Sequence, residues 1–167
     1  MLNIGDNILY GAGGVMTIVD VREETVGSIN RSYYVLRPAR GRSESLTFVP
    51  VDNERLVSSM HPLLREDEIY ALLDSLGNLP SIEWVPENRA RQEYFKRVME
   101  SCDRAMIFAM IVAIDENGRR REAEGKKNFL SDENARAKAQ RLLYSEFSIV
   151  LGISEEQVAS LVLEKMN

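Results

Sequence analysis

The chain has 167 residues, of which 44% are hydrophobic and 28% are charged, and its net charge at pH 7 is −5. This length can bury roughly 70% of the unfolded surface in one or two units, and the composition excludes collagen-like and disordered proteins. The negative charge argues against a protein held on nucleic acid by bulk charge, so any contact with DNA must be local. Most of the cationic residues, 14 of 21, follow residue 80.

Cysteine and histidine are too few for several kinds of site. Cys102 is the only Cys and His61 the only His, which excludes an internal disulfide and a cluster of transition-metal ligands. These two residues come with no pattern for an oxyanion hole, so we expect no enzyme, metal or cofactor. The sequence has no apolar run of about 18 residues and no signal-peptide pattern at its start, and we expect a cytoplasmic protein.

The first third of the chain is predicted to form a small β domain. Short runs rich in β-branched and aromatic residues are separated by glycine-containing turns, at residues 8–10, 15–21, 33–36 and 46–49. The run at 15–21 alternates between apolar and polar side chains. Such short strands in so little chain predict a strongly bent SH3- or Tudor-like barrel, a fold that usually binds other molecules.

After residue 53 the hydrophobic period changes from 2 to 3.6, which predicts helices. We expect them at residues 66–76, 86–100, 103–117, 131–152 and 154–165. Pro86 suits the first position of its helix, Gly152 a helix end and Ser154 an N-cap. The predicted fold class is α+β, with a β domain at residues 1–59 followed by a compact all-helical domain at residues 60–167.

Trp84 is the most informative single residue. It is the only Trp, it lies just before the helix that begins at Pro86, and Arg89 and Arg91 follow within two helical turns. An exposed aromatic side chain flanked by cations is typical of a wedge that stacks on or between bases. The alternative is a Trp packed in the core or between domains, and the spacing by itself favours that alternative.

A cluster of cations follows further along the chain. Its members are Arg119, Arg120, Arg121, Lys126 and Lys127, and Arg136, Lys138 and Arg141 lie on the next predicted helix. Two interpretations are open. Composition favours a solvated loop, and the other interpretation is a patch that contacts phosphates.

Several motifs, taken in order, resemble a known family. In the first half they are Ile4-Gly5-Asp6, Tyr10-Gly11, Gly14-Val15, Tyr33-Tyr34-Val35-Leu36 and Phe48-Val49-Pro50-Val51-Asp52-Asn53. In the second half they are Glu83-Trp84, Ser101, Asp103, Gly125-Lys126-Lys127, Asp132-Glu133, Arg141-Leu142-Leu143-Tyr144 and Leu151-Gly152-Ile153. From about residue 2 to residue 165 the chain is similar to the CarD/CdnL family, whose RNA polymerase-interacting domain is shared with the transcription-repair coupling factor.

The resemblance implies a bacterial, non-enzymatic regulator of transcription. Its Tudor-like barrel is expected to bind the β subunit of RNA polymerase, and its helices to lie on promoter DNA at the upstream edge of the bubble. In the family a Trp matching Trp84 wedges into the distorted minor groove and slows bubble collapse, which stabilises the open complex. The expected DNA-binding residues are Trp84, Arg89, Arg91, Arg119, Arg120, Lys126 and Lys127.

The β domain departs from the family pattern at the polymerase contact. Many relatives have Arg where Phe48 stands and another basic residue near Glu24, so we expect a contact that is more apolar or uses other arginines. The expected polymerase-binding residues are Arg22, Arg37, Arg40, Arg42, Phe48 and Pro50. We expect a monomer that binds DNA weakly and without sequence preference when polymerase is absent, and no membrane. The alternative is an adaptor on polymerase that makes no direct contact with DNA.

Overall fold

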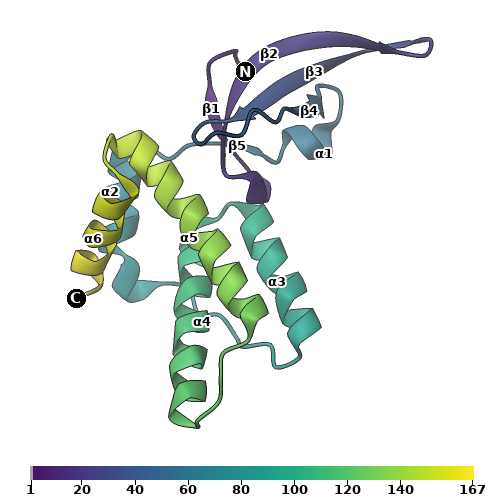
Figure 1. Ribbon diagram of the computed structural model, residues 1–167. Helices are drawn as coiled ribbons and strands as arrows, with labels where there is room; N and C mark the ends of the chain where they lie inside the picture. Colours follow the sequence, from purple (N-terminus) through teal and green to yellow (C-terminus); the bar gives the residue numbers. More distant parts are fainter. Residues whose placement is uncertain (1) are drawn as a thin grey trace. The chain divides into compact units, whose positions relative to one another are not determined.

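The computed structural model describes residues 2–167 and divides into two compact units, Met1–Leu63 and Leu64–Asn167 (Figure 1). The first unit holds all the strands found in the described residues, and the second is helical. The predicted α+β class, with strands before helices, is confirmed. The division falls a few residues after the expected boundary at residue 59, because residues 60–62 form a strand of the first unit. None of the helices within residues 2–167 is long and apolar enough to span a membrane.

The first unit is built on one antiparallel sheet with the strand order β4-β3-β2-β1-β5. The strands are β1 (Asn7–Tyr10), β2 (Val15–Val26), β3 (Ile29–Pro38), β4 (Thr47–Pro50) and β5 (Met60–Pro62), and a short helix, α1 (Glu54–Val57), precedes β5. Strands β2 and β3 extend further than predicted and meet at a two-residue turn, where Gly27 adopts a φ of 68° that favours glycine.

One face of this sheet forms the core of the first unit. The buried side chains on this face are Ile8, Met16, Ile18, Leu36, Val49 and Met60, and Leu9, Val15 and Val35 of the same strands are buried as well. A bulge between Ile18 and Asp20 shifts the register of β2 against β3, and bulges bend a strand and increase its twist. The alternation predicted for residues 15–21 therefore changes face within the strand.

The second unit contains five α-helices within the described residues. They are α2 (Glu66–Asp74), α3 (Asn88–Ser101), α4 (Arg104–Ala123), α5 (Leu130–Leu151) and α6 (Glu155–Met166). Asp103 caps α4 by accepting from the Met106 amide, and Ser154 caps α6 by accepting from the Gln157 amide. The long helices α4 and α5 form much of the core, where the rings of Phe108 and Phe147 lie with their centroids 6.0 Å apart.

Helix α4 does not end near Asn117 as predicted but continues to Ala123. Gly118 lies inside the helix and is buried, and a Cβ atom at this position would stand 3.1 Å from the Asn128 side-chain nitrogen. Close packing therefore accounts for this glycine, which is not a helix terminator. As a result Arg119, Arg120 and Arg121 belong to the last turns of α4 and not to a loop.

Candidate functional sites

Trp84 lies in the segment that leads into α3, and it is neither fully buried nor fully exposed. Its ring makes an edge contact with the ring of Phe95, with centroids 6.1 Å apart. The guanidinium carbon of Arg91 lies 4.8 Å from the centroid of the Trp84 ring, within the range of a cation–π interaction. Trp84 is thus held by α3 and remains partly accessible to solvent.

Arg91 fixes the whole segment around Trp84. Its side chain is only 1% exposed and donates to Asp132 Oδ1 at 2.9 Å. It also donates to the Val85 and Pro86 carbonyls, at 3.1 and 3.2 Å, and to Asn88 Oδ1 at 2.8 Å. A buried guanidinium is stable only when it is paired and hydrogen-bonded in this way. Arg91 therefore ties the Trp84 segment to the first turn of α5.

This burial argues against the predicted DNA contact of Arg91, because its nitrogens point into the protein and not toward a phosphate. Arg89, two residues earlier, is exposed as a DNA contact requires. Sequence analysis named Asp132 only as part of a family motif and missed its structural role. Asp132 is 3% exposed and accepts from both Arg91 and Gln92.

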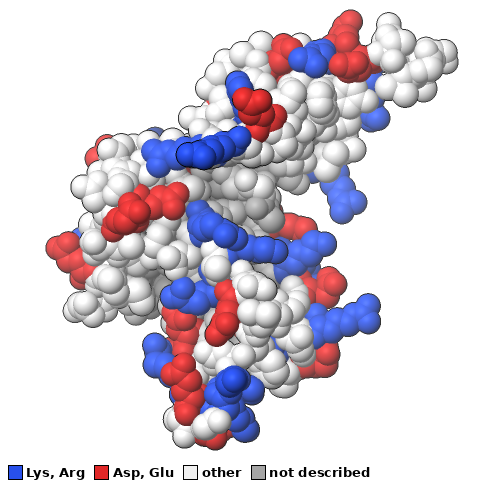
Figure 2. Space-filling model, viewed as in Figure 1, with Lys and Arg blue, Asp and Glu red and all other residues white. Residues whose placement is uncertain are grey.

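The predicted basic cluster separates into cations that make side-chain contacts with neighbouring residues and cations that are exposed. Lys126 pairs with Glu124 at 3.0 Å. Arg121 donates to the Lys127 carbonyl at 2.9 Å, and its guanidinium lies 4.1 Å from the centroid of the Phe129 ring. Arg119 and Arg120 are exposed on α4, and Lys127 is exposed in the connection to α5. Lys and Arg are interspersed with Asp and Glu on the face of the helical unit in Figure 2, so the cations form no broad patch of one sign there.

A hollow of about 240 Å³ lies beside Trp84. Ile82 and Trp84 form one wall, and residues of α4 that follow one helical stripe form the other, namely Ala113, Glu116, Asn117 and Arg120. Side chains spaced three and four residues apart on a helix lie on the same face. The hollow therefore combines an aromatic ring with a carboxylate, an amide and a guanidinium.

In the first unit, an exposed aromatic cluster lies on the face of β2, β3 and β4. Phe48 on the edge strand β4 is 42% exposed, and its ring meets the ring of Tyr33 edge-on with centroids 6.2 Å apart. The guanidinium of Arg22 lies 5.9 Å from the Phe48 centroid. The register pairs Tyr33 with Arg22 on one side and with Pro50 on the other. Three of the predicted polymerase-binding residues, Arg22, Phe48 and Pro50, are thus brought together.

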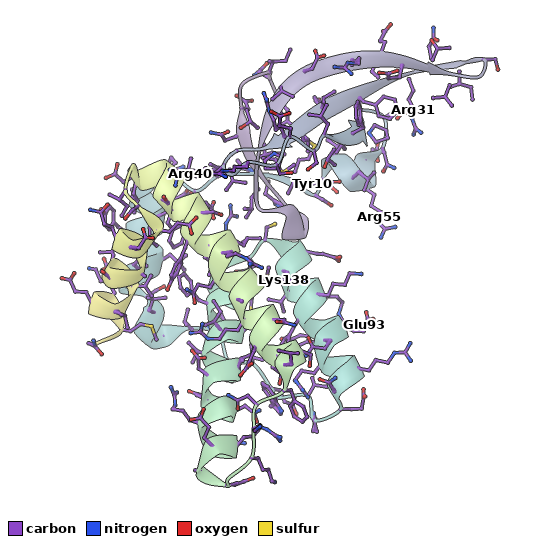
Figure 3. The ribbon with its side chains drawn as sticks, in the orientation of Figure 1. Tyr10, Arg31, Arg40, Arg55, Glu93 and Lys138 are labelled. Carbon is purple, nitrogen blue, oxygen red and sulfur yellow. The ribbon has the colours of Figure 1, made fainter. Side chains whose placement is uncertain are left out.

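The other predicted arginines of this unit are spread more widely. Arg37 is exposed on β3, at an even spacing from Tyr33 that places it on the same face. Arg40 and Arg42 are exposed in the connection between β3 and β4. Figure 3 shows Arg40 well away from Arg31, which lies near the turn between β2 and β3. The contacts of Phe48 with Tyr33 and Arg22 define a compact cluster on the sheet.

The acidic, histidine and cysteine side chains of the described residues were compared with the needs of a metal site. Within residues 2–167 no group of three or more His, Cys, Asp or Glu side chains could hold a metal ion. The chemistry of the two sites is instead that of aromatic rings, guanidinium groups and a few uncommitted polar side chains.

Comparison with known proteins identifies the first unit. Residues 2–62 match the family model of the CarD-like/TRCF RID domain, and the resemblance predicted from the sequence is confirmed over this segment. The chain carries an RNA polymerase-interacting domain of this kind and is consistent with a CarD-like protein. The match supports a role in transcription that includes binding to RNA polymerase. No curated protein matches the chain.

Proposed function

We propose that this protein is a non-enzymatic regulator of transcription that binds the β subunit of RNA polymerase and stabilises the open promoter complex. The observation that carries the proposal is the match of residues 2–62 to the CarD-like/TRCF RID domain. The sheet face around Phe48 binds polymerase, and Trp84 in the helical unit wedges into promoter DNA where the duplex opens.

The cluster around Phe48 has the chemistry of a protein interface. Aromatic side chains and Arg are enriched in such interfaces and supply most of their binding energy. Phe48 presents its ring to solvent, with Tyr33 and Arg22 against it. Strand β4 is also at the edge of the sheet, where a strand of the partner can pair with its backbone.

The Trp84 site suits a wedge because the ring is held in place before DNA arrives. A side chain that inserts only at a distorted base step stabilises opened DNA relative to closed DNA, and such a difference shifts the equilibrium between the two. The exposed cations of this unit, among them Arg89, Arg119, Arg120 and Lys127, are available to contact phosphates and position the protein.

The polymerase contact is tested by capturing RNA polymerase on the full-length protein. We expect Phe48→Ala and Arg22→Ala each to weaken binding by roughly 5- to 30-fold, the effect of losing an interface residue worth about 1–2 kcal/mol. Arg55→Ala is the matched control, because Arg55 is exposed on α1, outside the Phe48 cluster. Wild-type binding by both test variants would show that another surface holds polymerase.

The wedge is tested with Trp84→Ala in an assay of open-complex lifetime. We expect the lifetime to fall by about 5- to 150-fold, equivalent to the roughly 1–3 kcal/mol of one stacked base, while polymerase binding is unchanged. Phe95→Leu is the control, because it loosens the packing under Trp84 but keeps the indole ring. Equal losses in the two variants would contradict the wedge and point to general destabilisation.

The partial burial of Trp84 and the full burial of Arg91 favour one alternative function. In that alternative the protein is an adaptor on RNA polymerase, and Trp84 packs against α3 without touching DNA. The same pair of variants separates the two functions. An adaptor predicts a lower melting temperature for Trp84→Ala and no defect that depends on DNA.

A further inference from the structure

We propose that the hollow beside Trp84 binds one unstacked nucleobase that carries an exocyclic amino group, with Glu116 as the acceptor of that group. The inference rests on the proposed function, because it specifies which part of opened DNA the Trp84 site takes. Stacking on Trp84 alone would discriminate little between the bases. The contact with Glu116 would add a preference for some bases over others.

The size and walls of the hollow suit a single base. Its volume of about 240 Å³ leaves room for more than one water molecule beside the indole ring. Arg91 already covers one face of the indole ring, so at most one further planar group can stack on Trp84. The helical stripe of α4 forms the other wall and presents polar side chains.

These polar side chains are available to a ligand, as far as the described residues show. Within residues 2–167, the side chains of Glu116, Asn117 and Arg120 take part in no hydrogen bond or ion pair. The neighbouring Arg121 differs, since it donates to the Lys127 carbonyl. A carboxylate, an amide and a guanidinium beside an aromatic ring provide both acceptors and donors for a ligand that stacks on the ring.

The carboxylate determines which bases fit. Adenine, cytosine and guanine each carry an exocyclic amino group that a Glu or Asp carboxylate can accept from, as it does from cytosine N4. Thymine offers one ring N–H between two carbonyl oxygens, which repel a carboxylate. An unpaired base exposes this edge, and enzymes that take bases out of the duplex read it by hydrogen bonds and stacking. Glu116 also disfavours contact with phosphates, so it contributes to affinity only when a donor faces it.

The test uses the fluorescence of Trp84, which is the only Trp of the chain. Full-length protein is titrated at low salt with oligo(dC) and with oligo(dT) of the same length, two pyrimidine strands that differ at the edge Glu116 would face. We expect both strands to quench Trp84, and oligo(dC) to bind at least about fivefold more tightly, as one specific base contact requires. Equal affinities, or no quenching by either strand, would overturn the inference.

A pair of variants assigns the preference to Glu116. Glu116→Gln and Glu122→Gln remove the same charge from the same helix, and Glu122 does not line this hollow. We expect Glu122→Gln to strengthen binding of both strands by a similar factor and to keep the preference for oligo(dC). Glu116→Gln should reduce that preference to less than about twofold, since its amide donates as well as accepts. A preference that survives in Glu116→Gln rules out the role of Glu116.

The outcome can be separated from that of the proposed function. Polymerase capture and open-complex lifetime depend on the Phe48 cluster and on the Trp84 ring, and both are measured with the same proteins. If oligo(dC) and oligo(dT) bind equally while Trp84→Ala still shortens the open complex, base selection is wrong and the wedge stands. If Trp84→Ala has no effect on the open complex, the proposed DNA contact itself fails.

Discussion

The buried pair of Arg91 and Asp132 allows a quantitative prediction about the Trp84 segment. Arg91→Met keeps an unbranched side chain of similar length but removes the charge. The substitution leaves the Asp132 carboxylate buried, with Gln92 still donating to it at 2.6 Å. It also leaves the Val85 and Pro86 carbonyls without their donor. The variant therefore loses a charge pair and two hydrogen bonds to the backbone in one step.

Breaking a buried ion pair by removing one partner costs about 3–5 kcal/mol. Because Gln92 remains bonded to Asp132, we expect the lower end of that range, about 3 kcal/mol. For a unit of this size each kcal/mol lowers the melting temperature by roughly 4 °C or more, so the fall should be about 12 °C or more. Arg89→Met changes an exposed neighbour and should change stability by no more than about 0.5 kcal/mol.

The assay is a thermal melt followed in parallel by far-ultraviolet circular dichroism and by Trp84 fluorescence. The fluorescence reports the surroundings of Trp84 directly, because the Arg91 guanidinium lies over its ring. We expect the emission of folded Arg91→Met to differ from that of the wild type, and that of Arg89→Met to be unchanged. An Arg91→Met protein that melts within about 2 °C of the wild type would refute the reasoning, since the buried pair would then contribute almost nothing.

Two further predictions concern pH and salt. The Glu87 carboxylate accepts from the Ala90 and Arg89 amides at the start of α3, and these bonds lower the pKa of Glu87. The ionised carboxylate therefore stabilises the folded protein above the pKa that Glu87 has in the unfolded chain. This contribution is lost as pH falls through the lower pKa of the folded state. The melting temperature of Glu87→Gln should thus be below that of the wild type at neutral pH and approach it in acid, and a constant difference would contradict this. Without polymerase, duplex DNA should bind weakly, without sequence preference, and with an affinity that falls as salt rises, because few exposed cations displace counterions; tight binding at physiological salt would contradict this.

Much of the fold could be predicted from the sequence where one face of an element is buried. The strands around Ile8, Leu36 and Val49 were recognisable because their side chains form the sheet core. The outer part of the β2–β3 hairpin was missed. Val26 and Ile29 at its tip are exposed, and the polar residues 22–25 between the core and the tip give no alternation to read.

The end of α4 shows a different limit. Asn117-Gly118 has the composition of a helix terminator, but Gly118 is inside the helix because the Asn128 side chain packs against it. That contact joins α4 to the segment before α5, and local patterns carry no information about it. Tertiary packing thus outweighed a local signal.

The candidate DNA site was predicted in its composition but not in its geometry. The adjacency of Trp84 and Arg89 is visible in the sequence, whereas the bond from Arg91 to Asp132 joins residues that are 41 positions apart. The number of cations in this part of the sequence also does not show which of them face solvent. Arg121 donates to a carbonyl, whereas Arg120 lines the hollow. In both cases the deciding quantity is whether a guanidinium has a partner inside the protein.

The position of Trp84 between core and surface suits the proposed wedge. A fully exposed side chain would lose rotamer freedom when it inserts into DNA, and a fully buried one could not reach the bases. Phe95 at the ring edge and Arg91 over one ring face restrict Trp84 before binding, and preorganisation of this kind lowers the cost of association. The buried charge pair beneath Trp84 would then act on DNA indirectly, and folded Arg91→Met should shorten the open complex although Arg91 itself touches no phosphate.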